Sequence, residues 1–331
     1  MGSLLGRRVL AIALLSFLAA GCGGVQNAAV PQTSAAQGRV RQATGSSGDL
    51  VYAITAKGIV ILSYPTWSIV ARIRAYRNWY GVCSDPNNGN VFAVTGNNEI
   101  DEYAHGGTTP IAKIILPSGY PTACSVDPTT GNLAVTAIAT PTELRDTLFI
   151  YPKAQGSPTA YTDKRLPGLI SPAYDNAGNL FVGAINKARF ARIAELKVGR
   201  NQFTAIKLIG NPNAHLPQIQ WDGNSLVFLV PNGRGYGTTV NLLKISGKTG
   251  TIVKSFLLNY CQDEYFWIYK NSLLSFYYPP KVNNNTAIAA WNYPFGGKPA
   301  SRIYGVTRGR DYTYDLTVSV APTPSQVKTK R

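Results

Sequence analysis

Carboxylates able to bind a metal or activate water are scarce in this sequence of 331 residues, which has 16 Asp and Glu and only 2 His. Asp263 and Glu264, next to Cys261, are the best metal-ligand candidates, because they precede an aromatic run at the point where a strand is expected to enter the centre of the fold. A solvated acidic loop explains the same pair, and we prefer that interpretation. No GxSxG, HExxH or CxxC motif and no phosphate-binding glycine loop occurs. We therefore expect no catalytic residue and no cofactor, with a divalent metal such as calcium as the alternative.

Aromatic and basic residues occur together at two places and indicate a second chemistry, the binding of a sugar or a polyanion. Aromatic residues inside strands more often pack in the core, and we prefer that role for them. The candidate ligand-binding residues are Arg72, Arg74, Trp79, Tyr80 and Trp267.

These candidates lie in a part of the chain that contains a sequence repeat. Four aspartates recur ahead of a short apolar strand, at spacings of 42, 48 and 47 residues. In the copy TACSVDPTTGNLAVTA, Asp127 can accept backbone N–H groups, Gly131 can adopt a positive φ and Asn132 starts the next strand. Recurrence favours an architectural role over a chemical one. The structural turn residues are Asp85, Asp127, Gly131, Asn132, Asp175 and Asp222.

Each repeat predicts four short strands, because the aspartate turn is followed by a Gly/Pro turn between two further short segments. In the third unit we expect strands near 122–126, 132–138, 147–151 and 160–165. Six units of about 45 residues predict an all-β fold, a six-bladed β-propeller of four-stranded antiparallel blades. The first unit lacks its innermost strand, and the C-terminal segment RDYTYDLTVSV at 310–320 is expected to complete blade one and close the ring.

Three cysteines lie in the predicted propeller. Cys83 and Cys124 occupy similar places in adjacent innermost strands, and an exported protein could join them in a disulfide. Innermost strands of neighbouring blades are usually too far apart for a disulfide, so we favour buried thiols and keep the Cys83–Cys124 bridge as the alternative. A catalytic thiol would need a base, and His105 and His215 both fall in expected loops.

The unit D-x-x-x-G-N-[LV]-x-V resembles the repeat of the NHL and SMP-30-like group of six-bladed propellers, over residues 49–320. SMP-30-like enzymes are lactonases that hold a divalent metal in the central channel, so the resemblance implies a metal-dependent hydrolase as an alternative function. Few carboxylates are available for such a channel, and Glu99, Asp101 and Glu102 fall in an expected third strand. We therefore expect a non-catalytic binding or assembly scaffold.

The N-terminus, MGSLLGRRVLAIALLSFLAAGC, has two arginines and a short apolar stretch that ends at Cys22. The stretch is too short to span a bilayer comfortably and is typical of an export signal. LAAGC resembles the lipobox of bacterial lipoproteins, which implies that Cys22 becomes the lipidated first residue; a secretory signal with a chance cysteine is the alternative. We expect a signal peptide at 1–21, the lipidated cysteine and a flexible tether at 22–48, the propeller at 49–320 and a disordered basic tail at 321–331.

The formal net charge of +16 predicts attraction to anionic partners, although the basic residues are scattered through the chain. We expect localisation at an extracytoplasmic membrane face of a bacterial cell envelope. The expected partners are the membrane, through the lipid anchor, and an envelope protein, a glycan or another polyanion. Nucleic acid is not expected, because it needs a concentrated basic face.

Overall fold

The computed structural model describes residues 48–74, 79–141, 143, 145–185, 191–209, 218–232, 237–277, 287–306 and 313–322. The chain divides into two compact units, Met1–Arg39 and Val40–Arg331, and every described residue belongs to the second. Cys22, the signal peptide and most of the tether and tail lie outside the described residues. Within the described ranges, no helix has the length and apolar character needed to cross a membrane.

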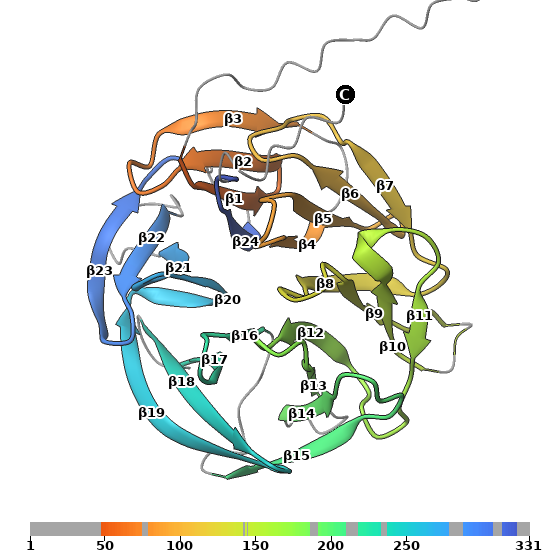
Figure 1. Cartoon of the computed structure of the whole chain (residues 1–331). Helices are drawn as coiled ribbons and strands as arrows, with labels where there is room; N and C mark the ends of the chain where they lie inside the picture. Colours follow the sequence, from red (N-terminus) through yellow and green to blue (C-terminus); the bar gives the residue numbers. More distant parts are fainter. Residues whose placement is uncertain are drawn as a thin grey trace, which may run out of the picture. The chain divides into compact units, whose positions relative to one another are not determined.

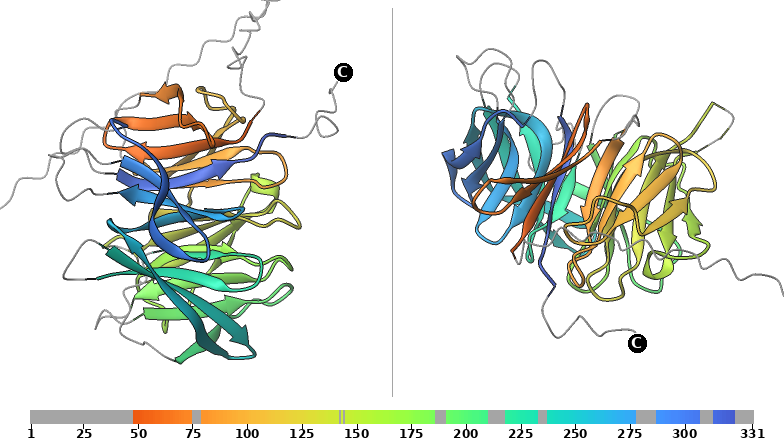
Figure 2. Two further views of the ribbon diagram at one scale, coloured as in Figure 1. Left: turned by 90° about the vertical axis from the view of Figure 1, so that its left-hand side faces the viewer. Right: turned by 90° about the horizontal axis from the view of Figure 1, so that it is seen from above.

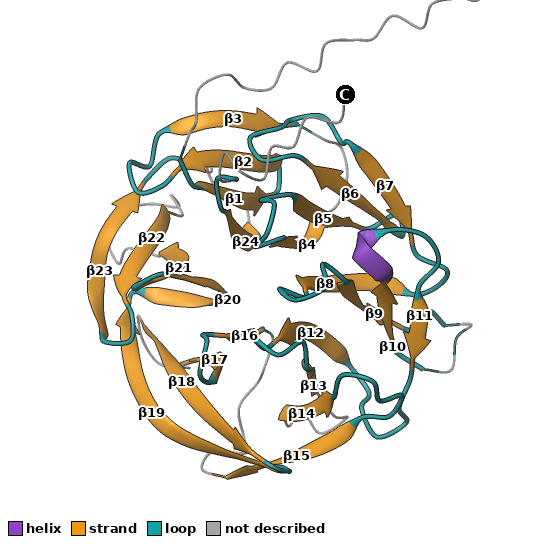
Figure 3. Cartoon of the chain, in the orientation of Figure 1, coloured by secondary structure: helices purple, strands orange, loops and turns teal. Residues whose placement is uncertain are grey.

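The described residues form strands almost throughout, and antiparallel pairing sorts them into groups of four (Figure 3). The first group runs in the order β24 (Thr313–Ser319), β1 (Leu50–Thr55), β2 (Gly58–Ser63) and β3 (Ile69–Ile73). The second contains β4 (Trp79–Ser84), β5 (Val91–Thr95), β6 (Glu99–Tyr103) and β7 (Ala112–Ile115). The third contains β8 (Tyr120–Val126), β9 (Leu133–Ile138), β10 (Thr147–Tyr151) and β11 (Thr159–Tyr161), with the short 3₁₀ helix η1 (Pro152–Ala154) between the last two strands.

Three further groups share one extended sheet. The fourth group contains β12 (Leu169–Tyr174), β13 (Leu180–Ile185), β14 (Ala191–Leu196) and β15 (Thr204–Ile209). The fifth contains β16 (Ile219–Trp221), β17 (Leu226–Pro231), β18 (Gly237–Ser246) and β19 (Thr249–Asn259). The sixth contains β20 (Cys261–Tyr269), β21 (Ser272–Tyr277), β22 (Ala287–Asn292) and β23 (Gly296–Ile303). Short parallel pairings join β15 to β19 and β19 to β23, so the outermost strands of these groups are continuous.

Burial falls from the inside of each group to the outside. The second strands, such as LVYAIT in β1 and VFAVT in β5, are buried along their whole length, which explains why they are apolar without alternation. The outer strands β7 and β11 are mostly exposed. Strands that are buried on both faces imply that each group is packed between two others.

The core consists of six hydrophobic clusters, and each combines side chains of two consecutive groups. One of them joins the last group to the first, because Leu274 and Phe276 of β21 pack with Leu316 and Val318 of β24. Figure 1 shows the groups arranged around a common centre, with β24, β4, β8, β12, β16 and β20 innermost. All strand pairings and clusters lie within Val40–Arg331, so this part of the chain contains the whole core and is expected to fold by itself.

Candidate functional site

A cavity of about 260 Å³ lies among the innermost strands, and we refer to it as the axial cavity. It is lined near the C-terminal ends of these strands, on the side of the molecule where the aspartate turns begin. Every group contributes, through Ser84 of β4, Ser125 of β8, Tyr174 of β12, Trp221 of β16, Trp267 of β20 and Val318 of β24. The innermost strand of every group therefore contributes to the cavity.

The axial cavity is lined by small apolar side chains together with uncharged polar groups and aromatic rings. No Asp, Glu, Lys, Arg or His is among the described residues that line it. Gln220 contributes an amide whose Oε1 accepts the backbone N–H of Ile268 at 2.6 Å, and this bond fixes the amide while its NH₂ group remains available. Trp267 and Trp221 add indole rings to the wall. Such a lining suits a neutral ligand that has both hydroxyl groups and an apolar face.

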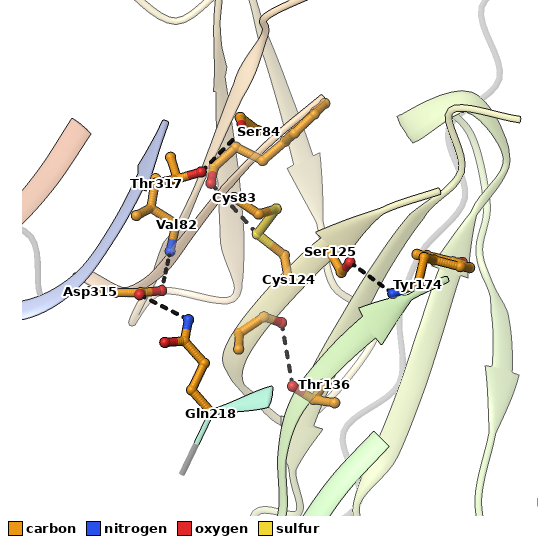
Figure 4. Close-up of a disulfide and its surroundings, with 12 residues drawn as sticks. Val82, Cys83, Ser84, Cys124, Ser125, Thr136, Tyr174, Gln218, Asp315 and Thr317 are labelled. Atoms are coloured by element: carbon orange, nitrogen blue, oxygen red, sulfur yellow. Dashed lines mark hydrogen bonds between the residues drawn. A yellow bond between two sulfur atoms is a disulfide. The ribbon is translucent and has the colours of Figure 1, made fainter. Parts of the chain in front are cut away.

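Serine side chains fix the cavity wall by linking neighbouring innermost strands (Figure 4). Ser84 Oγ donates to the carbonyl of Val318 at 2.8 Å. Ser125 Oγ accepts the N–H of Tyr174 at 3.3 Å, and Ser171 Oγ accepts the N–H of Ile219 at 3.1 Å. Because these hydroxyls are engaged in the wall, their role is to hold the strands in place.

One buried carboxylate connects three innermost elements behind the lining. Asp315 of β24 is 2% exposed, and its Oδ2 accepts the N–H of Val82 in β4 at 2.9 Å (Figure 4). Its Oδ1 accepts Nε2 of Gln218 at 3.1 Å and its neighbour's N–H at 2.8 Å. Gln218 in turn accepts the N–H of Phe266 in β20 at 2.6 Å. Multiple donors compensate the desolvation of the carboxylate, so it acts as a structural hub.

A disulfide joins Cys83 of β4 to Cys124 of β8, with their Cα atoms 5.7 Å apart (Figure 4). Our preference for buried thiols at these two positions is therefore wrong. The premise that innermost strands lie too far apart fails here because these strands converge toward the centre, where a short disulfide spans the gap. Cys261 is fully buried, and its Sγ lies 3.5 Å from Ser275 Oγ.

The four repeat aspartates hydrogen-bond to their own turns. In each case Oδ1 accepts the N–H of the residue two positions later, at 2.8 Å for Asp85, Asp127 and Asp222 and 2.9 Å for Asp175. Gly131 has φ +73°, and Asn132 Oδ1 accepts the N–H of Lys153. Burial raises the pKa of the Asp85 carboxyl despite these hydrogen bonds. The carboxylates organise backbone and do not point into the axial cavity.

The predicted basic and aromatic candidates are not brought together. Arg72 is exposed on the outer strand β3, where its Nη1 donates to the carbonyl of Val306 at 3.3 Å, and Arg74 follows the same strand. Trp79 is only 3% exposed and packs between the first two groups, while Tyr80 points into solvent. Among these candidates, Trp267 alone lines the axial cavity.

None of the predicted acidic candidates is among the described residues that line the axial cavity. Asp263 and Glu264 fall at the start of β20, and their side chains are outside the described part of the chain. In β6, Glu99 and Asp101 lie 3.2 and 3.7 Å from Lys113 Nζ, and burial raises the pKa of Glu102. Within the described ranges, no group of three or more His, Cys, Asp and Glu could hold a metal ion.

Sequence reasoning missed Gln218, Gln220 and Trp221, which contribute to the wall of the axial cavity. The signal was present in the repeat, since Trp221 immediately precedes a turn aspartate, as Ser84 and Tyr174 do in their own units. A residue at this point ends an innermost strand, and all three of these residues line the axial cavity.

Comparison with solved structures assigns the fold. The chain is similar to the β-propeller domain of Cps50 (Swd1) from Myceliophteria thermophila, with a TM-score of 0.51, 12% identity, and coverage of 79% of this chain and 84% of that one. It is also similar to a protein of unknown function from Bacteroides caccae, with a TM-score of 0.59, 12% identity, and coverage of 82% of this chain and 99% of that one. No family model and no curated protein sequence matches. The chain has a β-propeller fold.

Proposed function

We propose that the chain is a membrane-tethered lipoprotein of the cell envelope whose propeller is a non-catalytic binding scaffold. The lipobox-like segment ending at Cys22 and the small, polar tether support the anchor. The disulfide between Cys83 and Cys124 supports an extracytoplasmic location, because disulfides persist in oxidising compartments. The high positive charge is compatible with an anionic envelope surface.

The propeller is, in this proposal, six-bladed and closed, in the manner of the NHL and SMP-30-like group that the repeat resembles. The pairing of β24 with β1 supports closure, since Val318 lies opposite Val51 in an antiparallel ladder. The cluster that joins β21 to β24 supports it as well. Six groups of four strands around one axial cavity account for the blade number.

The scaffold binds a neutral, hydroxyl-rich ligand, such as a segment of a glycan, at the axial cavity. One observation carries this choice: the described lining combines two indole rings with amide and hydroxyl groups and has no charged side chain. Trp267 would stack against the apolar face of a sugar ring, and the Gln220 NH₂ group would donate to its hydroxyls. A calcium-dependent hydrolase of the lactonase type is the alternative, and it would rely on Asp263 and Glu264.

The decisive experiment measures melting of the chain from Val40 to Arg331 with a panel of neutral and acidic oligosaccharides, and with calcium. A neutral oligosaccharide is expected to raise the melting temperature. Trp267→Leu should abolish the rise, and Tyr80→Leu, which changes an exposed aromatic residue outside the cavity, should retain it. Calcium-dependent stabilisation that is lost in Asp263→Asn would instead favour the hydrolase, and stabilisation by acidic sugars only would contradict a neutral ligand.

A further inference from the structure

Acidic residues are almost absent from one long stretch of the sequence. Between residues 223 and 310 the only carboxylates are Asp263 and Glu264, against ten lysines and arginines. In the structure this stretch supplies the fifth and sixth groups of strands. The stretch therefore has a formal net charge of +8, half of the +16 of the whole sequence.

Apolar side chains are exposed in the same stretch. The exposed fractions are 59% for Val253 and 43% for Leu257 in β19, and 74% for Phe295 in the turn before β23. Lys254 and Lys298 are also exposed. The left panel of Figure 2 views the molecule from the side where β19 and β23 lie. We call Lys254, Phe295 and Lys298 the outer patch, because Leu257 lies three positions after Lys254 on β19 and projects from the other face of that strand.

Packing holds the outer patch in shape. Lys254 Nζ lies 5.0 Å from the centre of the Phe295 ring, and the rings of Phe256 and Tyr293 meet edge to face at 5.9 Å. A Cβ added at Gly296 would come within 2.4 Å of the Leu257 carbonyl oxygen, so the turn lies directly on β19. The exposed Phe295 is thus presented on an anchored turn.

In the part of the chain that the structure describes, the lysines of the outer patch differ from Lys113 in their ion pairs. On the outer strand β7, in the second group, Lys113 lies within 3.7 Å of two carboxylates, Glu99 and Asp101. Among the described residues, no ion pair involves Lys254 or Lys298. Exposed lysines beside an exposed phenylalanine create a surface that is both cationic and apolar.

We propose that the outer patch docks on the surface of an anionic lipid bilayer. Attraction between lysines and anionic headgroups would stabilise the bound state, and Phe295 would enter the boundary between headgroups and acyl chains. A soluble polyanion would pair with the lysines but would leave the Phe295 side chain in water, which is why the observations favour lipid. The 27 residues from Cys22 to Gly48 could span up to about 90 Å, so an anchored propeller could reach the bilayer in this orientation. This docking does not depend on the axial cavity.

The test is sedimentation of the chain from Val40 to Arg331 with large vesicles of neutral phosphatidylcholine, with or without 30% phosphatidylglycerol, at about 0.1 M salt. We expect binding to the anionic vesicles only. Lys254→Gln should weaken the partitioning roughly fivefold, since each lysine near such a surface contributes about that factor. Phe295→Ser should weaken it roughly tenfold through lost apolar burial.

The matched controls are Lys113→Gln and Ile115→Ser on β7, where the lysine is ion-paired and Ile115 is 59% exposed. Both controls should bind as the wild type, and the melting temperature should confirm that all four variants fold. If the patch variants and the control variants lost the same amount of binding to anionic vesicles, the outer patch would not be the docking surface. No binding to anionic vesicles, or tight binding to a soluble sulfated polysaccharide that Phe295→Ser leaves unchanged, would overturn the bilayer as the partner.

Discussion

Two glycines at equivalent places in the repeat differ only in what faces them. Gly89 and Gly131 each lie four residues after a turn aspartate, and their φ angles are +76° and +73°. A Cβ at Gly131 would meet nothing within 4 Å, whereas a Cβ at Gly89 would lie 2.3 Å from the carbonyl oxygen of Val320, just beyond β24. The turn at Gly89 thus also packs against the backbone that follows β24.

Alanine at these two glycines is expected to separate the two effects. Gly131→Ala should lower the free energy of unfolding by about 1–2 kcal/mol, the cost of a positive φ for a residue with a Cβ. Gly89→Ala should lower it by about 2–5 kcal/mol, because overpacking against Val320 adds to the same backbone cost. Urea unfolding of both variants measures the difference. An equal decrease in the free energy of unfolding for both variants would show that the backbone at Val320 moves away from the added methyl group at little cost.

The residue scale also shows where sequence reasoning failed. The repeat predicted that Cys83 and Cys124 occupy matching positions in adjacent strands, yet only coordinates give their Cα separation of 5.7 Å. Spacing along the chain carries no information on how closely innermost strands converge. The spread of the candidate ligand residues has a similar origin, since Trp79 and Tyr80 alternate on one strand and therefore face opposite ways.

At the scale of elements, a set of polar contacts joins the residues just before β1 to the end of β24, and we call this set the polar clasp. His105, after β6, lies with Nδ1 2.7 Å from Ser319 Oγ and Nε2 3.2 Å from the Gly48 carbonyl. Asp49 Oδ1 accepts the N–H of Ala321 at 3.2 Å, and its Oδ2 pairs with Lys270 at 3.1 Å. The clasp connects β1, β24 and the loop after β6.

This clasp is expected to weaken on mild acidification. Burial lowers the pKa of His105 below its ordinary value, although the Gly48 carbonyl and Asp49 oppose the shift. The unfolded chain therefore binds a proton more readily than the folded one, and the free energy of unfolding should fall as pH drops from about 7 to about 5.

Urea unfolding at several pH values, for the wild type and for His105→Gln, tests this dependence. The variant should lose the His105 contribution to the slope, whereas His215→Gln, which changes the other histidine of the sequence, should keep it. If the free energy of unfolding of His105→Gln changed with pH as steeply as that of the wild type, a group other than His105 would cause the pH dependence.

At the scale of the whole molecule, much of the architecture could be predicted, because a recurring turn fixes strand length and order. In the third unit the expected strands near 122–126, 132–138 and 147–151 match β8, β9 and β10 closely. The parallel pairing of β15, β19 and β23 could not be predicted, since lateral contact between outer strands depends on how the groups twist. The axial cavity escaped prediction for a related reason: its residues come from six distant segments and meet only in the folded chain.

The pairing of β24 with β1 makes the last strand important for the stability of the fold. Without it, β1 would lose its inner partner and the cluster shared with β21 would lose Leu316 and Val318, which are at most 1% exposed. Burial of these two side chains alone contributes roughly 3–6 kcal/mol, against a total stability of about 5–15 kcal/mol for a typical domain. A chain that ends at Val306 is therefore expected to lose cooperative thermal unfolding, and a peptide of residues 307–322 added in trans should restore it. A chain that ends at Pro322 keeps β24 and should melt as the full-length protein does. If the chain ending at Val306 melted at the same temperature, the first group would be stable with three strands, and β24 would not be needed for the stability of the fold.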